Sequence, residues 1–118
     1  MKISKHFNRE EFTCKCGCGQ DTVDKVLIDV LEDVREHFAV PVIITNGNRC
    51  SKHNAEVGGV KDSQHTKGRA ADIQVKGIHS DKVYEYIDSK YPDTLGVGKY
   101  TTFTHIDSRD NKARWTKK

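Results

Sequence analysis

Residues 63–72, which read Ser-Gln-His-Thr-Lys-Gly-Arg-Ala-Ala-Asp, decide the fold that this sequence predicts. They hold an imidazole, His65, and a carboxylate, Asp72, on either side of Gly68, which permits a tight turn. Over residues 69–75, small or polar residues alternate with apolar ones, as they do in a half-buried β-strand. Because side chains alternate along a strand, the apolar residues face the core and Asp72 faces the opposite side, where the turn brings His65 over it.

A second alternating segment, residues 102–107, carries another imidazole. Its pattern places His105 and Asp107 on one face of a strand. If this strand neighbours the first, Asp72, His105 and His65 form a set of two histidines and one aspartate. Such a set leaves a fourth position open, which is the pattern of a catalytic zinc site rather than a structural one.

The residues alone leave other interpretations open. A single histidine beside a glycine turn is commonly a solvated loop residue, and an aspartate at the start of a strand commonly serves a turn or a cap. The spacing therefore indicates a metal site without excluding structural roles for His65, Asp72 and His105.

Length and composition describe one small domain that covers residues 1–118. No apolar run approaches the roughly 18 residues that a membrane-spanning helix needs. Residues 1–5 are not followed by the apolar segment of a secretory signal, which predicts a protein that is cytoplasmic as synthesised. The net charge of +3 suits an anionic polymer such as the cell wall and also nucleic acid, so it does not discriminate between these two partners.

The other elements follow from periodicity. Apolar residues at helical spacing predict a long helix over residues 21–38, begun by Asp21 or Thr22. We further expect helices over residues 51–57 and 80–90, the latter capped by Ser80, and strands over residues 40–45 and 95–100. The tail, residues 108–118, is expected to fray or to contact an anionic partner. The pattern predicts the α+β class: an antiparallel sheet of about four strands, with helices packed on one face and the metal site on the other.

Four cysteines, Cys14, Cys16, Cys18 and Cys50, leave three possibilities open. Four thiolates can hold a structural zinc, but the one-residue gaps strain a chelate and differ from the common Cys-x-x-Cys spacing. Reduced thiols in a glycine-rich turn fit the pattern better. A disulfide with Cys50 requires an oxidising compartment.

Several short motifs occur in one order along the chain: Asn-Gly-Asn-Arg-Cys at 46–50, His-Asn at 53–54, Gly-Gly at 58–59, Ser-Gln-His at 63–65, Gly-Arg-Ala-Ala-Asp at 68–72 and Phe-Thr-His-Ile-Asp at 103–107. Together they closely resemble the zinc-dependent peptidoglycan peptidases of the D-Ala-D-Ala carboxypeptidase family, which include small phage and bacterial members. The hedgehog signalling domain shares that fold. The resemblance runs from about Phe7 to Arg109, and its most specific part is Ser-x-His-x-x-Gly-x-Ala-x-Asp followed by His-x-Asp.

The resemblance implies that His65, Asp72 and His105 bind Zn²⁺ and leave a position for water. It also implies a role for Arg49, because related enzymes place an arginine after this strand to hold the C-terminal carboxylate of the peptide. A guanidinium can clamp a carboxylate with two hydrogen bonds or stabilise an oxyanion, although the residues alone allow a surface arginine equally well.

The general base is less well defined. Several relatives carry an acidic residue three positions before the last histidine ligand, where this chain has Thr102. Asp107 lies on the same predicted strand face as His105. It is either the base or a carboxylate that orients a ligand imidazole.

Substrate contacts are expected from Ser63, Gln64 and Tyr100. Ser63 and Gln64 can instead hold their loop through side-chain hydrogen bonds to the backbone. Tyr100 and Phe103 either line a substrate groove or pack in the core.

The sequence therefore predicts a zinc metallopeptidase that hydrolyses peptide bonds in peptidoglycan stem peptides, as a D-Ala-D-Ala carboxypeptidase or an L-Ala-D-Glu-type endopeptidase. We expect a monomeric, phage endolysin-like protein that acts on the wall after release or export, without a nucleic-acid partner. The alternative is a non-catalytic zinc-binding module that recognises wall peptides or a protein partner. Thr102 in place of the expected acid favours this alternative, whereas Arg49 and Ser63 oppose it.

Overall fold

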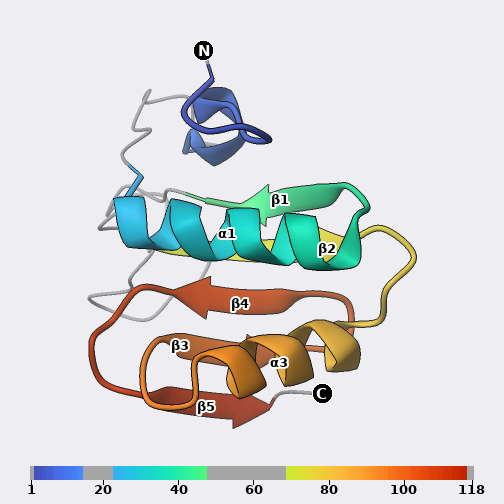
Figure 1. Ribbon diagram of the computed structural model, residues 1–118, viewed down its shortest axis with the longest axis vertical. Helices are drawn as coiled ribbons and strands as arrows, with labels where there is room; N and C mark the ends of the chain where they lie inside the picture. Colours follow the sequence, from blue (N-terminus) through green and yellow to red (C-terminus); the bar gives the residue numbers. More distant parts are fainter. Residues whose placement is uncertain (1, 15–22, 48–68, 117–118) are drawn as a thin grey trace.

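The computed structural model describes residues 2–14, 23–47 and 69–116 (Figure 1). A short 3-10 helix, η1 (Arg9–Phe12), precedes the helix α1 (Lys25–Phe38), and a second α-helix, α3 (Ser80–Lys90), follows the first two strands. The strands are β1 (Val42–Asn46), β2 (Ala70–Val75), β3 (Gly96–Lys99), β4 (Thr104–Asp107) and β5 (Ala113–Thr116). The predicted α+β class is confirmed, while the helix expected over residues 51–57 lies outside the described residues.

The five strands form one mixed sheet in the order β1-β2-β4-β3-β5. Neighbouring strands are antiparallel except β3 and β5, which run parallel. The expectation of an antiparallel sheet of about four strands is therefore wrong in number and in direction. The four expected strands are present and pair with one another in antiparallel fashion, but the C-terminal residues add a fifth strand, parallel to β3.

The C-terminal residues that were expected to fray form this edge strand, and Arg114 holds it in place. Its Nε donates to Asp88 Oδ1 at 2.7 Å, and its terminal nitrogens donate to the carbonyl oxygens of Tyr91 and Leu95, each at 2.7 Å. A guanidinium carries five donors in a fixed fork, so one side chain can satisfy several carbonyls of the turn that follows α3. The sequence showed Arg114 only as one charge of a basic tail, because those carbonyls converge only in the folded chain.

Both described helices cover the same face of the sheet, α1 over β1 and β2 and α3 over β3 and β4 (Figure 1). The core lies between these layers, where Leu31, Val34, Ile73, Val97 and Ile106 are at most 1% exposed. Burying such side chains supplies the main free energy of folding, at roughly 1.5–3 kcal/mol each. The residues that alternate with the apolar ones in β2 and β4 point to the opposite face.

Helix α1 begins later than the sequence predicted. Its N-cap is Asp24 rather than Asp21 or Thr22, which lie outside the described residues, and Ala39 ends it in the left-handed conformation with φ of 56°. Val23, directly before the cap, is not helical and packs against the core. None of the described helices is both long enough and apolar enough to cross a membrane.

Helix α3 has the predicted span, but Ser80 is not its cap. The ring Nδ1 of His79 accepts a hydrogen bond from the backbone N–H of Asp81 at 3.1 Å, so His79 is the N-cap. Ser80 already belongs to the helix, is buried, and donates its hydroxyl to the carbonyl of Tyr100 at 2.6 Å. Of the four cysteines, Cys14 is buried and the other three lie outside the described residues.

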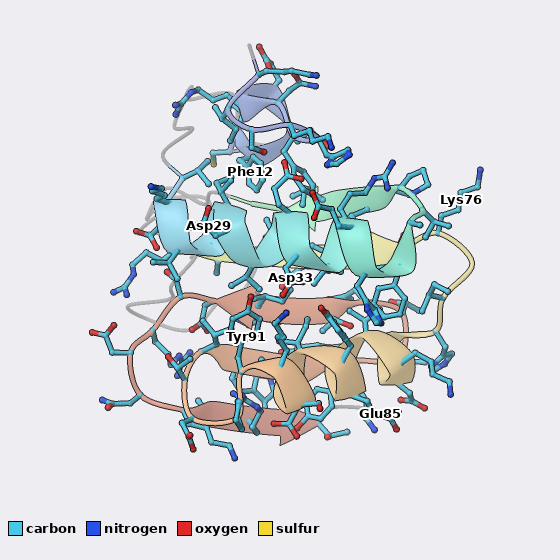
Figure 2. The ribbon with its side chains drawn as sticks, in the orientation of Figure 1. Phe12, Asp29, Asp33, Lys76, Glu85 and Tyr91 are labelled. Atoms are coloured by element: carbon cyan, nitrogen blue, oxygen red, sulfur yellow. The ribbon has the colours of Figure 1, made fainter. Side chains whose placement is uncertain are left out.

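Asp33 joins the two helices (Figure 2). From α1 its carboxylate accepts the hydroxyl groups of Tyr86 at 2.7 Å and Tyr91 at 2.8 Å, and Lys90 Nζ lies 3.6 Å away. Burial raises the pKa of Asp33, but the bonds from both tyrosines and the charge of Lys90 outweigh it, so the pKa lies below its ordinary value. Burial and the bond to Asp33 raise the pKa of Tyr86 to about 12.

We expect Asp33→Ala to lower the free energy of unfolding by about 1–3 kcal/mol at pH 7, because two half-buried hydroxyl groups lose a charged acceptor. Since the folded-state pKa of Asp33 is lowered, its contribution is fully present above the unfolded pKa of about 4 and is lost as the pH falls below it. Urea denaturation at pH 7 and pH 3 measures both effects.

The matched control is Asp29→Ala, because Asp29 is exposed one turn earlier on the same helix (Figure 2). It should change the stability by less than about 0.5 kcal/mol. Equal losses for both variants would contradict a specific role of Asp33.

Candidate metal centre

Four strands bring one residue each into a single row across the sheet. Asp72 of β2 pairs with His105 of β4, His105 pairs with Gly98 of β3, and Gly98 pairs with Trp115 of β5. The two alternating segments are neighbouring strands, which is the condition under which Asp72 and His105 were expected to share one face. The register places a carboxylate, an imidazole and an indole side by side on the face opposite the helices.

His105 lies between two carboxylates. Its Nδ1 is 2.9 Å from Asp72 Oδ1, and its Nε2 is 2.9 Å from Asp107 Oδ2. Only 8% of the residue is exposed. Burial opposes a charge on the ring, but the hydrogen bonds to Asp107 and Asp72 outweigh it and raise the pKa of His105. The two ring nitrogens thus have different partners, which fixes the orientation of the imidazole.

Asp107 is fully buried and is bound on both oxygens. Arg109 donates from Nε to Oδ1 and from Nη2 to Oδ2, each at 2.7 Å, and its backbone N–H donates to Oδ1 at 3.2 Å. Burial raises the pKa of Asp107, but the bonds from His105 and Arg109 outweigh it and hold the pKa far below its ordinary value. Such a carboxylate is a weak proton acceptor. These contacts favour the orienting role over the base role for Asp107.

Gly96 of β3 provides the space for this ion pair. A Cβ atom at Gly96 would lie 2.3 Å from Asp107 Oδ2 and 2.6 Å from Arg109 Nε, well inside any tolerated contact. The Gly-x-Gly pattern at residues 96–98 already indicated a strand that other groups approach closely. Which groups approach it became apparent only from the pairing of β3 with β4 and β5.

The structure brings together Asp72, His105 and Asp107, three of the residues that the sequence predicted for the site. Thr102, at the position of the expected acid, is exposed, and its backbone carbonyl accepts a hydrogen bond from Gln74 Nε2 at 3.0 Å. Four other predicted site residues lie outside the described residues, and their roles stay predictions: Arg49, Ser63, Gln64 and His65.

Three aromatic rings lie beside this group. The Trp115 ring centroid is 5.1 Å from that of His105, and Trp115 Nε1 donates to Tyr100 Oη at 3.1 Å. The Tyr100 and Phe103 rings stack at 4.3 Å and 12°. Tyr100 and Phe103 were expected near a substrate groove or in the core, whereas Trp115 was not, because the tail that carries it was expected to fray or to contact an anionic partner.

A cavity of about 230 Å³ lies next to Phe103. Ile43 and Gln74 line it, and they pair with each other across β1 and β2. Gln74 lies two residues beyond Asp72 and therefore on the same face of the sheet. Its lining also includes Ile73 and Val83 of the core, and none of Asp72, His105 and Asp107 lines it.

A second group of metal-binding side chains lies between the N-terminal segment and α1. His6, Glu32 and Glu36 offer ligand atoms within 4.8 Å of one another. Glu32 already accepts hydrogen bonds from the ring and the backbone N–H of His6, at 2.5 and 2.7 Å, and from the Ser4 hydroxyl. These hydrogen bonds attach the N-terminal segment to α1 and account for the grouping. Glu36, the third member, is exposed.

These features define a class: a small α+β domain whose sheet presents a histidine between two aspartates on the face opposite its helices. A family model described as Peptidase M15 matches residues 5–107, and the chain belongs to this family. The predicted membership among D-Ala-D-Ala carboxypeptidase-like zinc peptidases is thereby confirmed. A search among curated proteins finds no match. Family membership indicates a metallopeptidase, and peptidases of this family are typically zinc-dependent.

The described residues fit a zinc ion. Zinc binds histidine nitrogen and aspartate oxygen, and His105 Nδ1 and Asp72 Oδ1 converge to 2.9 Å. The other ring nitrogen of His105 contacts the buried carboxylate of Asp107. Proteins commonly orient a metal-binding histidine in this way.

We expect Asp107→Asn to weaken zinc binding about 10–100-fold, because the amide no longer orients His105 as the carboxylate does. Competition titration against a zinc chelator measures the affinity, and circular dichroism checks the fold. Asp110→Asn is the control, since Asp110 is exposed three residues further along. An unchanged affinity in a folded Asp107→Asn protein would contradict the orienting role.

Proposed function

We propose that this protein is a zinc metallopeptidase that hydrolyses peptide bonds in the stem peptides of peptidoglycan. The observation that carries the proposal is the His105 imidazole, held between Asp72 and Asp107 inside the segment that matches Peptidase M15. A histidine oriented by a buried carboxylate on one nitrogen keeps its other nitrogen directed at a second ligand.

The residues take distinct roles in this proposal. His65, Asp72 and His105 bind zinc, which supplies an activated water and polarises the scissile carbonyl when it is bound. Asp107 keeps the His105 ring in its orientation, and Arg109 keeps the Asp107 carboxylate ionised.

Substrate is held by residues around this centre. Arg49 clamps a substrate carboxylate, as a guanidinium does with two parallel hydrogen bonds. Ser63 and Gln64 bind the peptide from the segment that precedes His65 in the sequence. Tyr100, half-buried and hydrogen-bonded to Trp115, contributes an aromatic contact to the peptide.

Two bonds remain candidates within this proposal: the terminal D-Ala-D-Ala bond and the L-Ala-D-Glu bond. An arginine that binds a free carboxylate favours the carboxypeptidase step, whereas an endolysin-like role in wall lysis favours the endopeptidase step. Product analysis separates the two, because each cut releases different new termini.

A second candidate function is a zinc-binding module that recognises wall peptides without cutting them. Two observations favour it: Thr102 stands exposed where relatives carry an acid, and the Asp107 carboxylate is bound by both His105 and Arg109. Neither observation concerns zinc or peptide binding, so both candidates share the same metal centre and differ only in hydrolysis.

Purified protein incubated with peptidoglycan sacculi should release new peptide termini that mass spectrometry identifies. Chelation should abolish the release, and added zinc should restore it. His105→Ala should lower the rate about 100-fold or more, since it removes a proposed ligand. His79→Asn is the control, because His79 is an exposed helix cap and asparagine also caps helices well.

Each outcome of this experiment decides between the two functions. Zinc-dependent release that His105→Ala removes and His79→Asn retains supports the peptidase. If the protein binds zinc and peptide but releases no new termini, the result would contradict the peptidase and support the binding module.

A further inference from the structure

The two glycines of β3 carry no side chains and so leave space on one face of the sheet. The indole of Trp115 fills part of this space. Gly98 pairs with His105 on one side and with Trp115 on the other. A Cβ atom at Gly98 would lie 2.3 Å from Trp115 Nε1 and 2.4 Å from Cε2. The indole therefore lies across β3 in the space that any other side chain would occupy, which brings its ring centroid to 5.1 Å from that of His105.

The indole is held in this position by several contacts. Its Nε1 donates to Tyr100 Oη at 3.1 Å, and the Arg109 guanidinium lies over the ring at 5.5 Å from the centroid. The strand that carries Trp115 is anchored through its neighbour Arg114. A ring that is oriented before a ligand arrives loses little conformational entropy on binding. Trp115 is nevertheless only half-buried, so part of it remains accessible.

Trp115, Tyr100 and Phe103 together form an aromatic wall beside His105, since the first two are hydrogen-bonded and the last two are stacked. The polar atom of Trp115 is engaged with Tyr100, and the charge of Arg109 is paired with Asp107. The wall therefore offers aromatic carbon rather than unpaired charge. Ring faces pack well against methyl groups and flat peptide planes.

We infer that Trp115 is a substrate-binding residue, and that the aromatic wall binds the alanyl residues and peptide planes next to the bond that is cut. This inference rests on the proposed peptidase function and names the part of the substrate that one side of the site binds. The match to Peptidase M15 covers residues 5–107 and ends before β5. The role of Trp115 thus follows from the geometry of the fifth strand.

Steady-state cleavage of a sugar-free stem pentapeptide tests the inference. Trp115→Ala should raise KM about 5–10-fold, because the largest ring of the wall is lost, while kcat changes less. Trp115→Phe should recover most of the affinity, since it keeps a ring. Zinc affinity should change less than about twofold in both variants, because neither removes a proposed ligand.

Two further variants separate binding from folding. Gly98→Ala should raise KM as Trp115→Ala does, because the added methyl group displaces the indole while Trp115 itself is unchanged. Thr116→Ala, at the exposed next position of β5, should leave KM unchanged. Thermal melting identifies any variant that fails to fold, and Gly98→Ala keeps the test decisive if Trp115→Ala unfolds, because it displaces the indole without removing it.

Trp115 is the single tryptophan of the chain, so its fluorescence reports on this wall directly. Titration of the zinc-loaded protein with the pentapeptide should give a saturable change in emission, whether or not the peptide is cut. A change in emission without cleavage would support peptide binding by the aromatic wall and contradict the proposed peptidase function. Cleavage with an unchanged KM in Trp115→Ala and Gly98→Ala would support the peptidase and overturn the role of Trp115.

The same variants assayed on a disaccharide-linked stem peptide identify the bound group. A rise in KM on both substrates supports binding of the peptide portion. A rise confined to the disaccharide-linked substrate would overturn that assignment and place the sugar on the rings instead.

Discussion

The antiparallel register between β2 and β4 is the constraint on which the site depends. It sets Asp72 opposite His105 and, two residues along, Ala70 opposite Asp107. Because side chains alternate along a strand, a slip of one residue would turn the polar residues of the slipped strand into the core and its apolar residues outward. The same register therefore secures the packing of Ile73 and Ile106 beneath the helices and the grouping of polar residues on the other face.

The buried ion pair of Asp107 and Arg109 is the costly part of this arrangement. Taking a carboxylate out of water is unfavourable unless its hydrogen bonds are replaced, and here Arg109 and His105 replace them on both oxygens. Gly96 makes the pair possible by leaving out a side chain, as Gly98 does for Trp115. Two missing side chains in one short strand thus shape both the candidate metal centre and the group of aromatic rings beside it.

The predictions from sequence succeeded where the signal was local. The alternation in residues 69–75 and 102–107 predicted two strands, and both are present as β2 and β4. Helix boundaries were less accurate, because capping depends on where the chain leaves the core: Asp24 and His79 are the caps, and the sequence favoured other residues. The fifth strand was missed because Ala113–Thr116 is short and weakly patterned. It is held by its pairing with β3 and by the hydrogen bonds from Arg114 to the carbonyls that follow α3.

The sequence by itself determined the class of fold and the two strands that carry Asp72 and His105, since these follow from side-chain alternation along single segments, and its ordered motifs determined the resemblance to the family. It left two roles open for Asp107 and assigned none to Trp115. The tertiary structure favoured one role for Asp107 by placing Arg109 against it in a fully buried site. It also placed Trp115 beside His105 by adding β5 in parallel to β3. Both outcomes depend on contacts between strands, and the sequence of a single strand does not specify which neighbour will lie beside it.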